Sequence, residues 1–200
     1  MIETLLELDR SLFLKINTEW ISHFTDAIMP VWRDAKTWIP LYLLIVVLLV
    51  YRFGIRVWPW LVTVGLMILC SDQLSSHLIK PLVARVRPCN EPLLEGQVRR
   101  LLGYCSGSYS FTSSHAVNHF CIASFIFFTL RAHTGKWLGL LFLWAFSIAY
   151  GQVYVGIHYP LDITCGAILG TTIGYLFAWL YNRKIKLPPV RKPLHKTTIA

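Results

Sequence analysis

Residues 137–157 read WLGLLFLWAFSIAYGQVYVGI, a run of 21 residues without a charged side chain. A helix of about 20 apolar residues spans the hydrocarbon core of a bilayer. Two further long apolar stretches, with one aspartate each, cover residues 57–79 and 161–181, and two shorter ones cover residues 38–51 and 115–130. We therefore predict an all-α integral membrane protein, a bundle of five transmembrane helices.

The composition agrees with a membrane protein. Hydrophobic residues make up 55% of the 200 residues, charged residues only 14%, and the mean hydropathy is +0.53. A soluble domain carries about 25% charged residues, so this chain has too few to cover a water-facing surface. Soluble globular, disordered, coiled-coil and collagen-like classes are excluded on the same figures.

The basic residues predict the orientation. The links 52–56 and 131–136 and the segment from residue 183 together hold ten Lys and Arg and no acidic residue. The opposite side holds nine Lys and Arg with all ten acidic residues. An excess of Lys and Arg in short loops marks the cytoplasmic side, so we expect a cytoplasmic C-terminus.

Three parts are expected along the chain. Apolar residues are mixed with charged ones in residues 1–36, at a spacing that predicts amphipathic helices in the membrane interface. Residues 37–182 form the transmembrane domain. Residues 183–200 form a basic tail that contacts membrane lipids. Nucleic acid is not expected as a partner, because no aromatic residues interleave the tail; the oligomeric state is left open.

Polar residues gather at the non-cytoplasmic ends of the predicted spans. Lys80 and Arg87 follow the second span, His115 opens the third, and His158 and Asp162 flank the turn between the fourth and fifth. Ionisable groups at a membrane span are costly and usually functional.

This set of side chains suits phosphoryl transfer. Lys and Arg provide charge for phosphate, and two histidines can serve as nucleophile and general acid. Asp162 can hold the His158 imidazole in one tautomer. Arg85 is expected to be an ordinary loop charge, and His119 to pack or hydrogen-bond within its span.

Three segments resemble the motifs of the type 2 phosphatidic acid phosphatase (PAP2) family of membrane lipid phosphatases. The first, Lys, six residues, Arg-Pro, matches residues 80–88. The second, Pro-Ser-Gly-His, resembles residues 112–115, Thr-Ser-Ser-His. The third, Ser-Arg, five residues, His, three residues, Asp, resembles residues 151–162, in which Gly151 and Gln152 replace Ser and Arg.

The resemblance implies a metal-independent lipid phosphatase, with no cofactor and a phosphohistidine intermediate. It implies His158 as the nucleophile, Asp162 as its partner and His115 as the general acid. The implied phosphate-binding residues are Lys80, Arg87, Ser113, Ser114 and Gln152. The substrate is expected to be a lipid phosphate: a prenyl pyrophosphate such as undecaprenyl pyrophosphate first, then phosphatidylglycerol phosphate, phosphatidic acid or lipid A 1-phosphate.

Gln152 leaves three explanations open, because it lacks the charge of the motif Arg. Arg85 or another base takes over, the enzyme is slow, or the chain only binds lipid phosphates. If the charge is missing, Gln152→Arg is expected to raise turnover. A transporter is disfavoured, since no internal symmetry is visible in the sequence.

Two further features bear on packing. Cys89 and Cys105 lie in the long loop of residues 81–111, which we expect to cover the catalytic surface, and a disulfide between them is predicted. Gly166 and Gly170 have the spacing of close helix packing in the last span.

Overall fold

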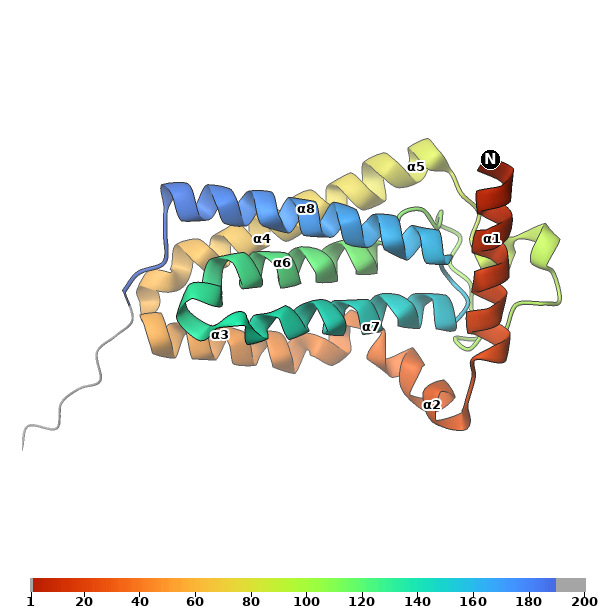
Figure 1. Ribbon diagram of the computed structural model, residues 1–200, viewed down its shortest axis with the longest axis horizontal. Helices are drawn as coiled ribbons and strands as arrows, with labels where there is room; N and C mark the ends of the chain where they lie inside the picture. The colour runs from red at the N-terminus through yellow and green to blue at the C-terminus, as the bar shows by residue number, and fades with distance from the viewer. Residues whose placement is uncertain (1, 190–200) are drawn as a thin grey trace, which may run out of the picture.

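The computed structural model describes residues 2–189, and within that range every regular element is a helix (Figure 1). The α-helices are α1 (Ile2–Leu14), α2 (His23–Trp32), α3 (Ile39–Phe53), α4 (Trp58–Asp72), α5 (Lys80–Val83), α6 (Ser114–Thr134), α7 (Leu140–Tyr154) and α8 (Pro160–Lys184). Gln73–Ile79 and Lys15–Glu19 are π-helical. Short 3-10 turns cover Ala35–Trp38, Ile55–Val57, Pro88–Asn90, Pro92–Leu94 and Lys136–Gly139.

The long helices α3, α4, α6, α7 and α8 run side by side in a bundle (Figure 1). The predicted all-α membrane fold is confirmed. Within residues 2–189, four helical stretches are long and apolar enough to cross a membrane: Ala35–Phe53, Ile55–Leu94, Lys136–Tyr154 and Pro160–Lys184. α6, which corresponds to the third predicted span (residues 115–130), is not among them, although it lies along the same bundle.

α6 differs because it is the central helix, in contact with α4, α7 and α8. Its polar side chains meet protein partners instead of lipid. Ser124 Oγ donates to the Thr171 carbonyl at 2.9 Å, and Trp60 Nε1 donates to Thr129 Oγ1 at 2.9 Å. A helix surrounded by other helices needs no continuous apolar surface.

Glycines of α8 allow its close contact with α6. A Cβ on Gly170 would lie 2.1 Å from the Val117 carbonyl oxygen, and one on Gly166 would lie 3.0 Å from the Ala116 Cβ. The close packing predicted from the Gly166–Gly170 spacing is confirmed. This packing fixes the start of α6 against the start of α8, where the candidate site residues lie.

α1 crosses one end of the bundle and α2 lies beside it (Figure 1). Asn17, just after α1, donates to the Tyr154 carbonyl at 2.8 Å and to the Arg99 carbonyl at 3.0 Å. The N-terminal segment is therefore tied to α7 and to the long loop between α5 and α6. The interfacial role of residues 1–36 stays a prediction.

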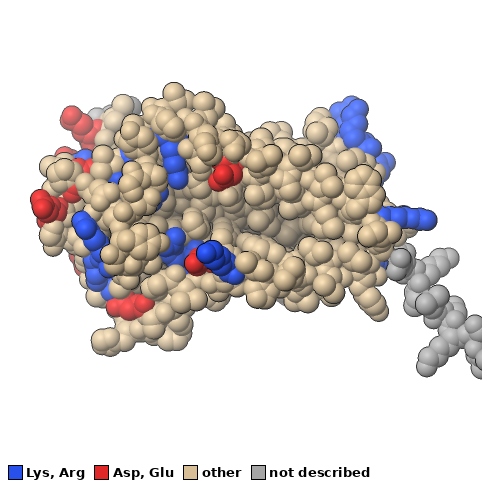
Figure 2. All heavy atoms as spheres, turned by 180° about the vertical axis from the view of Figure 1, so that it is seen from behind, with Lys and Arg blue, Asp and Glu red and all other residues tan. Residues whose placement is uncertain are grey.

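The charged residues gather toward the ends of the molecule. Figure 2 shows Lys, Arg, Asp and Glu at the end that carries α1, and only Lys and Arg at the opposite end. Much of the surface between them carries no charge on this face. Of the predicted basic tail, Arg183, Lys184 and Lys186 are described. Its other members, Arg191, Lys192 and Lys196, lie outside the described residues.

The long loop before α6 is closed by the Cys89–Cys105 disulfide, with 6.0 Å between the two Cα atoms. The predicted pairing is confirmed. Arg100 Nη2 also donates to the Cys89 carbonyl. The bridge brings Tyr104 and Ser106, on either side of Cys105, into the same region as Arg87.

Candidate active site

A cavity of about 360 Å³ lies where the long loop meets the starts of α6 and α8 and the end of α2. Its lining residues come from the end of α2, the helical stretch from Gln73 to the start of α5, the long loop before α6, the start of α6 and the turn between α7 and α8. They are Arg33, Ser76, Lys80, Arg87, Tyr104, Ser106, Ser114, His115, Ile157 and His158. The structure thus brings together Lys80, Arg87, Ser114, His115 and His158, five of the predicted site residues.

A sharp turn between α7 and α8 presents His158. Gly156 adopts a φ of +92°, and a Cβ at this position would lie 2.8 Å from the Arg99 carbonyl oxygen. Only glycine adopts this backbone readily. The His158 amide then donates to the Gln152 carbonyl at 3.2 Å, which ties the turn back onto α7. The turn therefore requires glycine at position 156 for two reasons: the positive φ and the lack of space for a Cβ.

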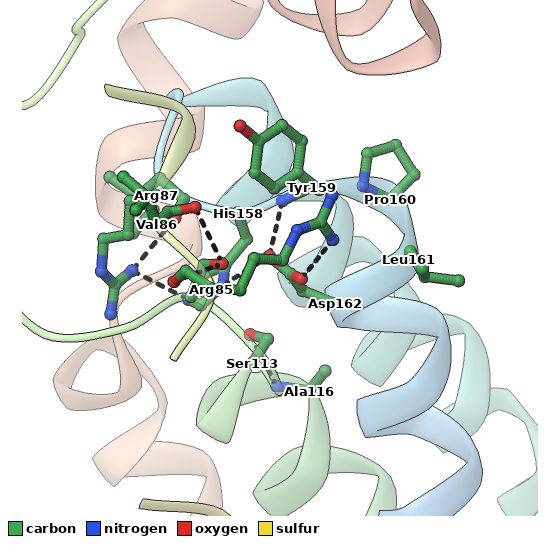
Figure 3. Close-up of polar contacts among 12 residues, drawn as sticks. Arg85, Val86, Arg87, Ser113, Ala116, His158, Tyr159, Pro160, Leu161 and Asp162 are labelled. Atoms are coloured by element: carbon green, nitrogen blue, oxygen red, sulfur yellow. Dashed lines mark hydrogen bonds and ion pairs between the residues drawn. The ribbon is translucent and has the colours of Figure 1, made fainter. Parts of the chain in front are cut away.

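The two ring nitrogens of His158 face different partners (Figure 3). Nδ1 lies 3.4 Å from Asp162 Oδ2, and Nε2 lies 3.1 Å from Arg87 Nη1. A carboxylate beside Nδ1 favours the tautomer that carries its proton there. The lone pair of Nε2 then accepts from Arg87 Nη1 at the edge of the cavity.

Burial of His158 keeps the imidazole neutral. The side chain is 2% exposed, and desolvation lowers its pKa to about 4, although Asp162 opposes the shift. An ordinary histidine has a pKa near 6.5. At neutral pH His158 therefore carries an unprotonated nitrogen, which a nucleophile requires.

Arg85 is bound into the base of the site, and the expectation of an ordinary loop charge is wrong. Its Nη1 donates to Asp162 Oδ1 at 2.8 Å (Figure 3). Its Nη2 donates to Asp9 Oδ2 at 2.6 Å. The guanidinium also lies 3.9 Å from the centre of the Tyr159 ring. Because Arg85 is engaged by two carboxylates, it does not supply free charge to the cavity.

Asp9 completes this arrangement from the first helix. Its side chain is 4% exposed, and its Oδ1 accepts from the Leu161 amide at 2.8 Å in the first turn of α8. Asp9, Arg85, Asp162 and His158, in that order, therefore form a continuous chain of polar contacts. It connects α1 to the imidazole.

Arg87 is held by the loop and the turn. Nε donates to the Ser108 carbonyl at 2.8 Å, Nη2 to Ser108 Oγ at 2.9 Å and Nη1 to the Ile157 carbonyl at 3.0 Å. Neutral acceptors hold the guanidinium here, so its positive charge remains available to an anion in the cavity.

His115 lies one helical turn before His119, with 6.2 Å between the ring centres. His119 Nδ1 lies 2.8 Å from the His115 carbonyl oxygen, and its ring packs on Trp144. The expected packing role of His119 is confirmed. His115, by contrast, lines the cavity with His158.

Two predicted phosphate ligands do not line the cavity. Ser113 is the N-cap of α6, where its Oγ accepts from the Ala116 amide at 3.4 Å (Figure 3). Gln152 is fully buried, and its Nε2 donates to the Arg33 carbonyl at 3.2 Å. Ser114, which lines the cavity, pairs with Ser76 at 2.9 Å between hydroxyl oxygens. The phosphate-binding roles of these side chains stay predictions.

Four polar lining residues were not predicted from the sequence: Arg33, Ser76, Tyr104 and Ser106. None belongs to a resembled motif. Arg33 is 8% exposed and lies at the end of α2, far in sequence from Lys80 and Arg87, the other cations that line the cavity. The only available signal was a basic residue at the junction between the amphipathic N-terminal segment and the first span.

The family model described as PAP2 superfamily matches residues 60–186. The chain belongs to the PAP2 superfamily. Family membership is thus confirmed, and this PAP2 chain is a lipid phosphatase, a phosphoric ester hydrolase with membrane-spanning helices.

Relatives of this PAP2 protein cover most of its length. A lipid A 4'-phosphatase of Bacteroides thetaiotaomicron is 34% identical over 92% of this chain and 81% of its own. A lipid A 4'-phosphatase of Porphyromonas gingivalis is 30% identical over 91% of this chain and 77% of its own. The fold resembles the crystal structure of a PAP2-type phosphatidylglycerolphosphate phosphatase from Bacillus subtilis. That likeness has a TM-score of 0.70 and 21% identity, and covers 92% of this chain and 88% of that one.

Proposed function

We propose that the chain hydrolyses a lipid phosphomonoester through a phosphohistidine on His158. The observation that carries the proposal is the placement of His158. Nδ1 faces Asp162, and Nε2 faces the cavity region that Arg87, Lys80 and His115 also line. A neutral nucleophile, a partner for its developing charge and nearby cations are the groups that phosphoryl transfer needs.

In the first step the Nε2 lone pair attacks phosphorus and an N–P bond forms. The P–O bond to the lipid breaks and its electron pair stays on the lipid oxygen. His115, which takes up a proton when the phosphate anion binds beside it, gives that oxygen the proton. Arg87, which faces Nε2 in this structure, is positioned to bind an equatorial phosphate oxygen when the nucleophile engages. Asp162 stabilises the positive charge that develops on the ring.

In the second step water attacks the phosphohistidine. The N–P bond breaks, its electrons return to Nε2, and His115 accepts a proton from the water. Inorganic phosphate leaves, and both histidines return to their starting states. Lys80 and Arg87 supply positive charge to the phosphoryl oxygens throughout, so the proposal requires no metal ion.

The substrate we propose is a phosphorylated lipid A. Two relatives that match over nine-tenths of this chain are lipid A 4'-phosphatases. The proposal places lipid A phosphate ahead of the prenyl pyrophosphate expected first from the motifs. The site is proposed to lie on the outer face of the bacterial inner membrane, since the basic links and the described start of the tail (Arg183, Lys184 and Lys186) are at the other end of the bundle.

The test is release of inorganic phosphate by the detergent-purified chain in the presence of EDTA. Lipid A, undecaprenyl pyrophosphate, phosphatidylglycerol phosphate and phosphatidic acid are supplied in parallel. We expect release from lipid A, lost in His158→Ala and retained in His23→Ala, a histidine outside the cavity. Release from none of the lipids by a folded protein contradicts the proposal and favours the lipid-phosphate-binding alternative.

A further inference from the structure

Arg33 is a buried cation without a carboxylate partner. The residue is 8% exposed and lines the cavity beside Lys80 and Arg87. Among residues 2–189 no ion pair includes Arg33, and its buried Nε makes no hydrogen bond. An unpaired charge that has lost its water is costly, and an anion in the cavity would offset that cost.

We propose that Arg33 binds the phosphoryl group and supplies the positive charge that Gln152 lacks. The proposal deepens the proposed function and rests on it for the identity of the anion. Arg85, the other candidate for this role, is excluded because Asp9 and Asp162 engage its guanidinium. A guanidinium also offers the forked donors that match phosphate oxygens.

The two departures from the third motif are what bring Arg33 to this place. A Cβ on Gly151 would lie 3.0 Å from the Arg33 Cβ and 3.8 Å from its Cα. A serine there would meet the end of α2 with its Cβ already in tight contact and its hydroxyl beyond. Gly151 therefore makes room for Arg33 against α7.

Gln152 serves the same contact from the next position. Its Nε2 donates to the Arg33 carbonyl at 3.2 Å, which fixes the backbone at the end of α2. Trp32 Nε1 donates to Ser147 Oγ at 2.9 Å, a second tie between α2 and α7. An arginine at 152 would instead place a second cation beside Arg33 in a fully buried position.

This arrangement reverses the expectation that Gln152→Arg raises turnover. With Arg33 present, we expect Gln152→Arg to lower turnover, because it removes the amide contact and adds like charge. In the Arg33→Gln background the same change returns a cation to the site. Arg33→Gln/Gln152→Arg is therefore expected to bind phosphate more tightly than Arg33→Gln alone.

The experiment measures binding of inorganic phosphate and release of phosphate from lipid A with the full-length chain. Arg33→Gln is expected to weaken phosphate binding and kcat/KM by about 10- to 100-fold, the range for one charge-assisted contact. Arg33→Lys keeps the positive charge but loses the forked donors of the guanidinium. Its phosphate binding and kcat/KM are expected to lie between those of the wild type and Arg33→Gln. Lys36→Gln is the control, because it removes an exposed cation close in sequence to Arg33 and outside the cavity.

Phosphate binding separates this proposal from the proposed function. If Arg33→Gln weakens phosphate binding while no lipid is hydrolysed by the wild type, the Arg33 assignment stands and the proposed function fails. If the wild type hydrolyses lipid A and Arg33→Gln equals it in both measurements, the Arg33 assignment is overturned. A rise in turnover in Gln152→Arg alone overturns it too. Arg33→Met, which keeps the aliphatic stem, replaces Arg33→Gln if that variant does not fold.

Discussion

Asp162 Oδ2 lies 3.4 Å from Nδ1 of His158, on the side of the imidazole opposite the nitrogen that faces Arg87. Asp162 is fully buried and also accepts from the Tyr159 amide at 2.9 Å and from Arg85. The carboxylate therefore has a fixed position from which it orients the ring. The tautomer of His158 therefore depends on Asp162, a residue four positions later, in the first turn of α8.

Asp162→Asn is expected to lower kcat by roughly 10³ to 10⁴, the loss seen when a carboxylate that orients a catalytic histidine becomes an amide. The amide can hold the ring in the wrong tautomer and cannot stabilise its positive charge. Phosphate release under saturating lipid is the measurement. Glu95→Gln, an exposed acid in the long loop, is the matched control. A loss of less than tenfold in folded Asp162→Asn would count against the orienting role.

Asp9→Asn is expected to lower both stability and kcat, because Arg85 then has one carboxylate in place of two. The lost charge-assisted contact is worth about 1–3 kcal/mol, observed as a lower denaturation midpoint. The fall in kcat should exceed any change in KM, since Asp9 acts through Arg85 and Asp162. Glu7→Gln, an exposed acid of the same helix, should match the wild type. Equal behaviour of the two variants would mean that the Asp9–Arg85 contact does not support the site.

The burial of His158 determines the pH at which its imidazole becomes protonated. Because its pKa is lowered to about 4, the ring stays neutral as pH falls through 6, where an ordinary histidine becomes half protonated. Histidine NMR titration of the purified protein measures this directly, with His158→Gln to assign the signal. We expect no protonation of His158 above about pH 5. A midpoint near 6.5 would contradict the buried environment described here.

The Cys89–Cys105 bridge should stabilise the loop that carries Tyr104 and Ser106 to the cavity. Closing a loop of this length is worth about 3 kcal/mol. Cys89→Ser/Cys105→Ser is therefore expected to lower the denaturation midpoint and to raise KM for the lipid. Cys70→Ser, at an exposed free cysteine, is expected to leave both unchanged. An unchanged KM in the double variant would mean that the bridged loop does not contribute to binding of the lipid substrate.

Close contact between α6 and α8 predicts a steep response at Gly170. Gly170→Ala places a methyl group against the Val117 carbonyl and is expected to cost about 1–3 kcal/mol through overpacking. Gly65→Ala in α4 meets no atom within 4 Å and should be neutral or slightly stabilising. Thermal unfolding in detergent compares the two. If Gly65→Ala is the more damaging, the packing account is wrong.

The sequence predicted much of the site because its main residues stand at span ends with fixed spacing. The ends of adjacent membrane helices lie at the same face of the bundle. One cavity at this face therefore contains Lys80, Arg87, His115 and His158. The bundle was predictable from apolar length. α6 was the least apolar span, because its neighbours satisfy its polar groups.

The positions of Arg85 and Arg33 depend on long-range contacts, which the hydrophobic periodicity of a sequence does not predict. Arg85 was assigned to the loop because its partner, Asp9, lies in a helix that the sequence places only near the interface. Arg33 reaches the cavity from the end of α2, where it packs against Gly151, a position without a side chain. Both contacts join segments more than 70 residues apart, and neither follows from local pattern.

The most direct test of the account traps the intermediate on His158. The chain is mixed with lipid A, quenched within a single turnover and digested under alkaline conditions, in which phosphohistidine survives. Mass spectrometry of the peptide that contains residue 158 is then expected to show one added phosphoryl group on His158. The group should be absent in His158→Gln and also in Asp162→Asn at the same time point. Lipid hydrolysis by His158→Gln at the wild-type rate, or a phosphoryl group on another residue, would contradict the account.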